Sequence, residues 1–342
     1  MKYFQCDYAE GAHPRVMEAL MRTNMEQTVG YGMDEYCARA ADKIRALCQA
    51  PHAAVHFLTG GTQVNLIAVS AALRPHQSVI CTPIGHINTH ETGAVEAAGH
   101  KCLTVPEDNG RVTAEEVRKC VLAHDTEHET QPGMVYISIA TESGTNYTRA
   151  ELARLYDVCQ EYGLILYMDG ARLACAMADA ACDWDLPFLC AHCHAFTMGG
   201  TKNGLLFGEA IIISHAGMAR DFRYIIKQRG GMLAKGRLLG VQFDAILEDG
   251  LYFQLGRHAV QLADKIRREL TALGLTFYAE NGTNQVFPIM RDTVLSDLSD
   301  RYRFEPWGRV DESHSAVRIA TSWATREEDV DQLLIDIKAA MA

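Results

Sequence analysis

The sequence has no long run of apolar residues and no excess of positive charge. No stretch of about 18 consecutive apolar residues occurs, so the pattern predicts no membrane-spanning helix. Lysine and arginine number 32 against 43 aspartate and glutamate residues, which gives a net charge of −11. Nucleic acids and anionic membranes both require basic surfaces. We therefore expect no nucleic-acid or membrane partner, while a local basic pocket for an anionic ligand remains compatible with this balance.

The chain also shows no export signal and no disulfide framework. The opening residues, Met1 to Asp7, turn polar at once, and the 11 cysteines are scattered and odd in number. Both observations predict reduced thiols in the cytoplasm. The length of 342 residues, with 48% hydrophobic and 22% charged side chains, suits a large domain plus a smaller one.

One cysteine cluster requires separate treatment. Cys190-Ala191-His192-Cys193-His194 matches the pattern for covalent haem attachment and could also serve as a zinc site. Haem attachment normally requires export, however, and the segment runs directly into the apolar stretch Ala195-Phe196-Thr197-Met198. We therefore favour ordinary residues beside a buried strand and expect no metal.

Short apolar runs alternate with helical patterns from residue 50 to residue 215. We predict strands at 55–58, 78–82, 134–140, 164–168 and 210–213, and helices at 61–73, 89–98 and 149–162. Strands and helices that alternate in this way form a mostly parallel sheet covered by helices.

The C-terminal part has a different pattern. It predicts helices at 220–247, 252–273 and 326–340, and strands near 275–278, 285–289 and 316–320. We expect a large domain at 1–247 and a small α+β domain at 248–342. The polar stretch 124–132 is expected to be a loop.

A lysine on a glycine-rich turn suggests the chemistry. Gly199-Gly200-Thr201-Lys202-Asn203-Gly204 lies one strand–helix unit after Met168-Asp169-Gly170-Ala171-Arg172. Taken singly, the first motif fits a surface loop and the second a helix cap. Together they fit pyridoxal phosphate, which needs a lysine for the Schiff base and an aspartate that keeps the pyridine nitrogen protonated.

Two more motifs are expected at the same edge, because ligands of open α/β sheets bind beyond the carboxyl ends of the strands. Gly60-Gly61-Thr62 opens a helix whose backbone N–H groups suit a phosphate, although a glycine-rich helix start alone has the same pattern. Gly85-His86 follows the next strand, where an imidazole could stack on a pyridine ring or belong to a surface loop.

Five separated motifs in this order resemble the low-specificity L-threonine aldolases. They are Gly85-His86-Ile87-Asn88, Asp169-Gly170-Ala171-Arg172, Thr201-Lys202-Asn203-Gly204, Lys227-Gln228-Arg229-Gly230-Gly231 and Val317-Arg318-Ile319-Ala320-Thr321-Ser322-Trp323. The resemblance covers nearly the whole chain. It implies fold type I of the pyridoxal phosphate enzymes, the aspartate-aminotransferase-like superfamily: a three-layer αβα domain with a mostly parallel sheet, plus a smaller C-terminal α+β domain.

The resemblance also implies which residues bind the cofactor. Lys202 would form the Schiff base, Asp169 would pair with the pyridinium nitrogen, and His86 would stack on the ring. The remaining cofactor contacts would come from Gly61, Thr62, Thr201, Arg172 and Arg229. Arg229, together with Lys235, would reach a phosphate across a subunit boundary.

Substrate contacts follow in the same way. Arg318 and Arg172 would hold the substrate carboxylate, and Tyr31 would reach into a neighbouring subunit's site. The chain departs from the family near this pocket: Cys6 replaces a serine that helps bind the carboxylate, Tyr8 replaces a small polar residue, and Thr89-His90 is unusual after His-Ile-Asn. These departures bear on the substrate more than on the cofactor.

The implied activity is retro-aldol cleavage of L-threonine, L-allo-threonine and related β-hydroxy amino acids to glycine and an aldehyde. It requires a base near the β-hydroxyl, for which we favour His128, with His86 as the second candidate. The same site could catalyse β-elimination instead. A protein that binds the cofactor without catalysing a reaction is the alternative from another functional class. Shared sites imply a homodimer at least, and a dimer of dimers is expected.

Overall fold

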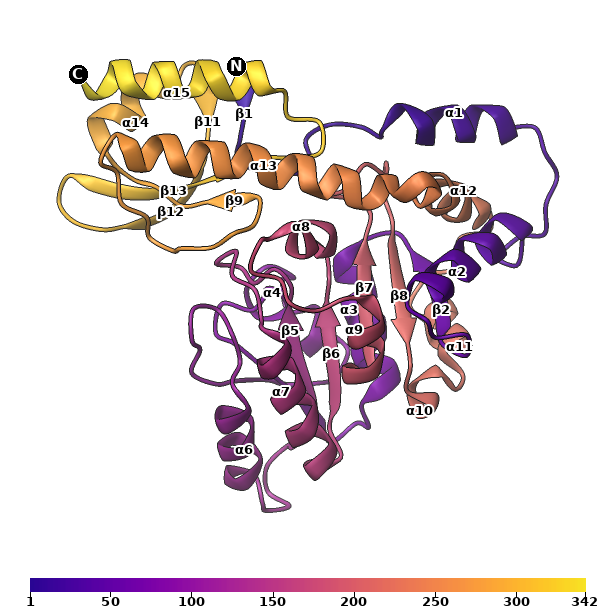
Figure 1. Ribbon diagram of the computed structural model, residues 1–342. Coiled ribbons are helices and arrows are strands. Elements are labelled where there is room, and N and C mark those ends of the chain that lie inside the picture. The colour runs from indigo at the N-terminus through magenta and orange to yellow at the C-terminus, as the bar shows by residue number, and fades with distance from the viewer.

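The computed structural model describes residues 1–342, most of which pack around one seven-stranded sheet (Figure 1). The strand order is β2-β8-β7-β6-β5-β3-β4, and all neighbours are parallel except that β8 runs antiparallel to both β2 and β7. The predicted mostly parallel sheet is thus confirmed. The strands are β2 (Ala54–Leu58), β3 (Gln77–Cys81), β4 (Cys102–Thr104), β5 (Gln131–Ser138), β6 (Ile165–Asp169), β7 (Ala195–Gly199) and β8 (Glu209–Ile213).

Helices cover both faces of this sheet, because the side chains of each strand alternate between two cores. In β5, Val135 and Ile137 enter one core, whereas Met134 and Tyr136 enter the other. The first core is covered by α2 (Glu35–Leu47), α6 (Ala114–Ala123), α7 (Arg149–Tyr162), α8 (Leu173–Ala178), α9 (Leu186–His192) and α12 (Arg237–Ile246). The second is covered by α3 (Gly61–Ala72), α4 (His86–Thr89), α5 (Ala94–Ala97), α10 (Ala216–Ala219) and α11 (Phe222–Gln228).

A smaller unit at the C-terminal end has its own antiparallel sheet and core. Its central strand, β13, pairs with β10, β12 and β9. The 22-residue α13 runs from the large unit, where Leu251 and Leu255 are buried, into the small one, where Leu262 and Ile266 are buried. The elements are η1 (Glu248–Gly250), α13 (Leu251–Ala272), β9 (Gln285–Val286), β10 (Ile289–Arg291), α14 (Asp292–Leu298), β11 (Tyr302–Arg303), β12 (Glu305–Arg309), β13 (His314–Ala320) and α15 (Glu327–Met341).

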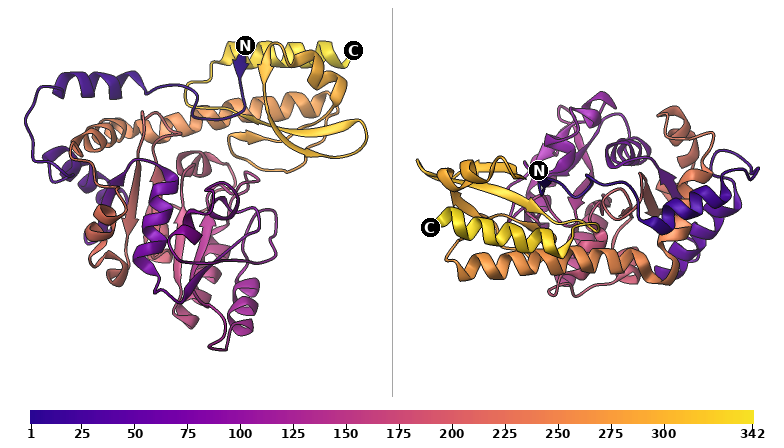
Figure 2. Two further views of the ribbon diagram at one scale, coloured as in Figure 1. Left: turned by 180° about the vertical axis from the view of Figure 1, so that it is seen from behind. Right: turned by 90° about the horizontal axis from the view of Figure 1, so that it is seen from above.

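The N-terminal residues belong to the small unit rather than the large one. β1 (Lys2–Tyr3) pairs in parallel with β11, and Phe4 lies in the C-terminal core. Figure 2 shows the N-terminus beside the C-terminal elements. The chain then crosses to α1 (Pro14–Thr23), which packs against α12. The expected large domain at 1–247 therefore differs from the structure at its first residues.

Local sequence signals account for several elements and for one break. The predicted helix at 149–162 is confirmed: Thr148 and Glu151 form a capping box at its start, and Gly163 ends it at a φ of 65°. The helix expected at 89–98 is instead split into α4 and α5. Thr92 (φ 53°) and Gly93 (φ 71°) adopt left-handed backbone conformations that a helix does not allow.

Other expectations fail at short elements. The strand expected at 275–278 is reduced to one bridge between Phe277 and Pro288, and β4 was not predicted. The helical stretch 220–247 is divided into α11 and α12, and Arg229 is the C-cap of α11. No helix is both long and apolar enough to cross a bilayer.

Candidate active site

The turn that carries Lys202 lies where β7 ends, at the carboxyl edge of the parallel strands. Gly199 N donates a hydrogen bond to Gly170 O (3.0 Å), which joins the ends of β7 and β6. Only glycine fits at position 199, because a Cβ there would come within 2.3 Å of Ala171 O. The close approach holds the turn directly beside Asp169.

Lys202 is half-buried among groups of both charges. It forms no ion pair, and its Nζ lies 5.9 Å from the centre of the Tyr8 ring. Burial and then the positive charge of Arg172 lower the pKa of Lys202. Three carboxyl groups oppose this shift: Asp7, Asp169 and Glu209. A lowered pKa makes the neutral, nucleophilic amine more accessible, as covalent chemistry at a lysine requires.

Asp169, the last residue of β6, is buried and fixed by three hydrogen bonds. Its Oδ2 accepts from Tyr136 Oη (2.9 Å) and Asn65 Nδ2 (2.9 Å), and its Oδ1 accepts from Ala171 N (3.0 Å). Tyr167 Oη in turn donates to Asn65 Oδ1 (2.7 Å). Since Asn65 belongs to α3, these bonds bring the first turns of α3 to the same edge as Asp169.

His86, the first residue of α4, is tied to a buried carboxylate. Its Nδ1 lies 2.8 Å from Glu91 Oε1, which also accepts from Asn65 Nδ2 (2.7 Å). Because a carboxylate accepts, this contact assigns the proton to Nδ1 and leaves Nε2 as the free acceptor of a neutral ring. His86 N donates to Glu142 Oε1 (2.8 Å), a group whose pKa is raised by burial.

Arg172 is bound through its fork to Asp7. Arg172 Nε and Nη2 donate to the two carboxylate oxygens at 2.7 and 3.0 Å, and Asn284 Nδ2 donates to Asp7 Oδ2 (2.9 Å). Burial alone would raise the pKa of Asp7, but Arg172, Lys202 and these hydrogen bonds outweigh it and place this pKa well below its usual range. Only the N–H groups of Arg172 that Asp7 does not occupy are therefore available to bind a substrate.

Arg318, in β13, reaches the same place from the small unit. Its Nη2 donates to Gln5 O (2.9 Å), whereas its buried Nε has no partner. Burial and then the neighbouring Arg172 lower the pKa of Arg318. Two guanidinium groups this close favour an anion between them. Cys6, half-buried, lies on the segment between the contacts of Gln5 and Asp7.

The start of α3 offers free donors. Gly60 caps the helix without a side-chain hydrogen bond, and a Cβ added at Gly60 or Gly61 would meet nothing within 4 Å. Thr62 is exposed beside them. Arg229 follows α11, which packs against α3, and its buried Nε has no partner. These groups fit a phosphate.

The residues present thus fit pyridoxal phosphate. Lys202 provides an unpaired amine, Asp169 a fixed carboxylate, and the start of α3 an open anion site within two turns of Asn65. Thr201 differs from this set, because its Oγ1 already accepts the N–H of Gly208 (3.1 Å).

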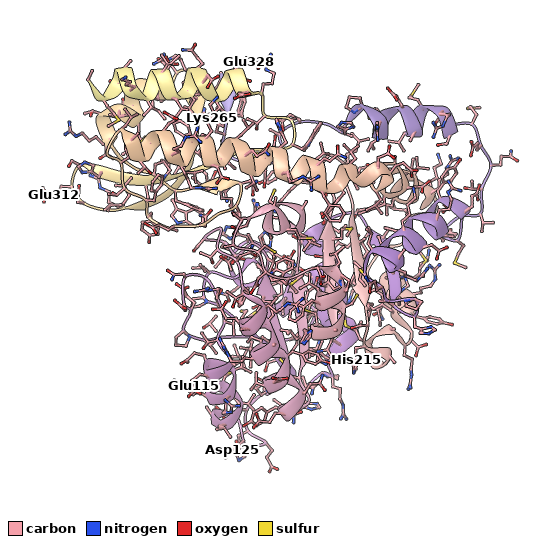
Figure 3. The ribbon with its side chains drawn as sticks, viewed as in Figure 1. Glu115, Asp125, His215, Lys265, Glu312 and Glu328 are labelled. Carbon is pink, nitrogen blue, oxygen red and sulfur yellow. The ribbon has the colours of Figure 1, made fainter.

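His128 does not join this cluster. It is exposed in the loop that leads into β5, so it lies at the amino end of a strand whose carboxyl end faces the lysine turn. Figure 3 labels Asp125, three residues earlier, at the tip of the large unit farthest from α13. The expectation that His128 approaches the substrate is therefore wrong within this chain. The amino and carboxyl ends of a strand are separated by the length of the strand, and His128 and the lysine turn lie at opposite ends.

Tyr31 also lies away from Lys202. Its side chain is exposed, Lys227 Nζ lies 4.6 Å from the ring centre, and its φ of 60° is unusual for a tyrosine. It lines a cavity of about 300 Å³ between α2, β2 and α11, whose walls include neither Lys202 nor Asp169.

The cysteine cluster has structural contacts. Cys193 is buried in the first core, and His194 Nδ1 accepts the backbone N–H of Leu166 (2.9 Å) at the start of β6. Burial lowers the pKa of His194 to about 4, which suits a neutral acceptor. These contacts indicate that Cys193 and His194 stabilise the neighbouring strands.

Sequence reasoning missed the polar residues that surround the predicted ones: Asn65, Glu91, Tyr136, Glu142, Tyr167, Glu209 and Asn284. Two of them carried a usable signal. Asn65 interrupts an apolar helix, and Glu209 opens the apolar strand that ends at Ile213. A polar residue in such a run is informative, because burying it requires a partner.

Comparison with solved structures shows which fold the chain has. An aspartate aminotransferase of Thermus thermophilus superposes with a TM-score of 0.71 at 17% identity, covering 99% of this chain and 91% of that one, which shows the fold. A threonine aldolase of Leishmania major superposes with a TM-score of 0.98 at 40% identity, covering 100% of both chains. The predicted fold type I architecture is confirmed.

Residues 4–293 match the beta-eliminating lyase family, and the chain belongs to that family. Within it, the low specificity L-threonine aldolase of Pseudomonas sp. (strain NCIMB 10558) is 34% identical over 99% of this chain and 98% of its own length. The predicted resemblance to the low-specificity L-threonine aldolases is thereby confirmed.

Proposed function

We propose that this protein is a pyridoxal phosphate-dependent L-threonine aldolase. It cleaves the Cα–Cβ bond of L-threonine, L-allo-threonine and related β-hydroxy amino acids to give glycine and an aldehyde. One observation carries the proposal: a half-buried Lys202 without an ion pair lies near the fixed carboxylate of Asp169 and the guanidinium of Arg172, and Arg172 in turn lies near Arg318. Full-length relatives bearing this name support it.

The cofactor would be held by residues at four elements: β6, the turn after β7, the start of α3 and the end of α11. Lys202 would hold it through the amine, Asp169 would provide the carboxylate for its ring nitrogen, and the start of α3 with Arg229 would provide the donors for its phosphate. When bound, pyridoxal phosphate draws electrons away from the Cα of the amino acid. Tyr136 and Asn65 keep the Asp169 carboxylate in one orientation for that purpose.

The substrate carboxylate would be oriented by the two arginines. Arg318 offers its unpartnered Nε, and Arg172 offers the N–H groups that Asp7 leaves free. Forked, charge-assisted bonds fix the direction of the carboxylate, and this in turn fixes which bond at Cα is broken. Cys6 lies on the segment between these contacts.

We assign the base for the β-hydroxyl to His86 instead of His128. Glu91 holds the Nδ1 proton of His86, so Nε2 is the acceptor that can take a proton directly or through a water. Glu91 also stabilises the positive charge that the ring then acquires, because its side chain is fully buried.

The active form is proposed to be a homo-oligomer, at least a dimer, and a dimer of dimers is expected. Large apolar side chains are exposed along α1 and the segment after it: Met21 (73%), Met25 (89%), Val29 (66%) and Met33 (63%). A second copy of the chain could cover these side chains, and its active site would then receive Tyr31, which does not contribute to the site of its own chain.

All 11 cysteines are free, which supports a reducing, cytoplasmic location.

The test is incubation of the holoenzyme with a panel of β-hydroxy amino acids, with measurement of aldehyde and glycine. Lys202→Ala should remove both the visible absorbance of the bound cofactor and the turnover. Lys101→Ala, an exposed lysine far from the turn, serves as the matched control and should keep both. Turnover that persists without the Lys202 amine would rule out its assignment.

Product analysis separates this function from β-elimination on the same fold. The aldolase releases equal amounts of glycine and aldehyde, whereas an eliminating lyase releases ammonia and a keto acid. A cofactor-binding protein without activity would keep the absorbance and give neither product. Ammonia as the main product would replace our proposal with the eliminating lyase.

A further inference from the structure

Glu142 lies on the turn after β5, between the two residues that we expect at the cofactor ring. β5 lies between β6 and β3 in the sheet, so its carboxyl end falls between Asp169, which ends β6, and His86, which follows β3. Other residues donate two hydrogen bonds to Glu142, and both end at Oε1: one comes from His86 N (2.8 Å) and one from Ser138 Oγ (2.8 Å). The proposed chemistry does not use this carboxyl group.

The position of His86 depends on contacts from outside its own helix. α4 has only four residues, and a helix of that length does not hold its first residue in place by itself. Its N-cap, Gly85, provides no side-chain hydrogen bond. Asn88 Nδ2 donates to Pro83 O (2.8 Å), which joins the helix only to its own loop. Glu142 therefore replaces the missing cap from a position 56 residues further along the chain.

The hydrogen bonds around Glu142 form a closed ring that contains both His86 and Asp169. All bonds of this ring measure between 2.7 and 3.2 Å, and the last one returns from the main chain of His86 to Glu142. In order, its members are Glu142, Ser138, Tyr136, Asp169, Asn65, Glu91 and His86. Two separate paths thus connect the histidine to the aspartate, and Glu142 completes the second one.

The two residues differ in how much they depend on Glu142. Asp169 would keep its three hydrogen bonds if Glu142 were removed, because none of them comes from Glu142. His86 N has no other acceptor, so removal of Glu142 would release the start of α4. Glu91 would still bind the imidazole, but the ring would move together with its main chain.

We propose that Glu142 is a positioning residue that holds His86 at the cofactor site. Its Oε1 accepts the first N–H of α4, whereas Glu91 orients the ring. This task requires an acceptor and not a charge, so an amide oxygen can also perform it. A displacement of about 1 Å can cost about 100-fold in rate, so the bond bears on turnover. The role of Glu142 rests on the proposed role of His86 and not on which amino acid is cleaved.

A double-mutant cycle between Glu142 and His86 tests this role in the holoenzyme. Glu142→Ala should lower kcat for threonine by about 10- to 100-fold with little change in KM. In the His86→Ala background the same substitution should change kcat by less than about twofold, because no ring is left to position. Glu142→Gln should recover most of the loss, since its Oε1 can accept both hydrogen bonds.

The circular dichroism of the bound cofactor gives a second readout that does not require cleavage. Glu142→Ala should change the visible ellipticity when the His86 ring is present and leave it unchanged in the His86→Ala background. Glu151→Ala is the matched control. Glu151 Oε2 also accepts a main-chain N–H at a helix start, that of Thr148 (2.7 Å), but at α7. This control should alter neither kcat nor the ellipticity.

Equal losses from Glu142→Ala in both backgrounds would overturn the proposal, because Glu142 would then act without His86. Parent-like kcat and ellipticity in Glu142→Ala, or a glutamine variant as impaired as the alanine variant, would also overturn it. Glu142→Asp keeps the charge but withdraws the acceptor. It should cause a smaller loss that also disappears in the His86→Ala background, and it completes the cycle if Glu142→Ala does not fold.

The two readouts separate this proposal from the proposed function. If the ellipticity depends on Glu142 only when the His86 ring is present, in a chain that cleaves no β-hydroxy amino acid, the proposed function is refuted and the role of Glu142 stands. If the chain cleaves threonine and the two substitutions act independently, the function stands and the role of Glu142 is refuted.

Discussion

At the scale of single residues, hydrogen-bond partners decide which charged groups remain available to a ligand. Arg172 and Arg318 are neighbouring guanidinium groups, yet Asp7 occupies the fork of the first, whereas the Nε of the second is free. The same reasoning separates His86, whose Nδ1 is fixed by Glu91, from the exposed His128. Residue type alone does not distinguish the members of these pairs.

Arg318→Ala should mainly weaken substrate binding. A hydrogen bond to a charged group contributes about 1.5–3 kcal/mol, so we expect KM for threonine to rise by about 10- to 100-fold with a smaller change in kcat. Steady-state kinetics across threonine concentrations measures this. Arg309→Ala, an exposed arginine on β12 of the same sheet, is the control. An unchanged KM would remove Arg318 from the carboxylate site.

His86→Ala should lower kcat by about 10²–10⁴-fold, the usual contribution of a general base. His128→Ala should leave kcat within twofold, because His128 lies at the opposite edge of the sheet. Equal losses in both histidine variants would contradict the assignment.

At the scale of elements, the start of α3 combines two functions. Its first turn presents open backbone N–H groups, and Asn65, one turn later, orients Asp169. One helix thereby sets the distance between the proposed phosphate site and the proposed ring site.

Arg229→Ala should weaken cofactor binding by about tenfold, which corresponds to loss of one charge-assisted hydrogen bond. Titration of the cofactor-free chain with pyridoxal phosphate, followed by absorbance, gives the Kd. Arg220→Ala removes an exposed arginine shortly before the same helix and should leave the Kd unchanged. Identical affinities for both variants would exclude Arg229 from the phosphate site.

Local signals predicted elements better than they predicted the site. β6 and α7 carry their own apolar pattern and caps, so both were expected at nearly the observed bounds. The split between α4 and α5 depends on the backbone at Thr92, which composition does not reveal. The lysine, the aspartate and the arginines followed from motifs and resemblance, whereas the Asp7–Arg172 pair joins residues 165 positions apart and requires the folded chain.

At the scale of the whole molecule, the N-terminal segment connects the two units. Its first strand pairs with β11, and Asp7 reaches Arg172 at the end of the large sheet. The buried ion pair therefore contributes to stability as well as to the geometry of the site.

Asp7→Asn should destabilise the fold by about 3–5 kcal/mol at neutral pH, because it leaves a buried arginine without its counter-charge. The pKa of Asp7 is lowered in the folded protein, so its contribution is complete above the usual aspartate pKa of about 3.9 and is lost as pH falls towards the lowered value. Urea unfolding at pH 7 and pH 3 should show a smaller difference between variant and parent at the lower pH.

Met25→Glu should prevent assembly and abolish activity, since it places a charge on the most exposed apolar side chain of the proposed interface. Sedimentation velocity and turnover at the same concentration measure both effects. Leu122→Glu alters an apolar side chain that is 60% exposed on α6 and should leave assembly intact. A fully active monomer would show that each chain's site is complete by itself.

Finally, α13 belongs to both cores and also touches the lysine turn: Tyr252 Oη donates to Gly199 O (2.9 Å), and Asn203 Nδ2 donates to Tyr252 O (2.8 Å). Recombination between relatives is therefore constrained. A crossover placed just before this helix would separate the turn from the side chain that supports it, so chimeras should inherit residues 199–203 and 251–272 from one parent.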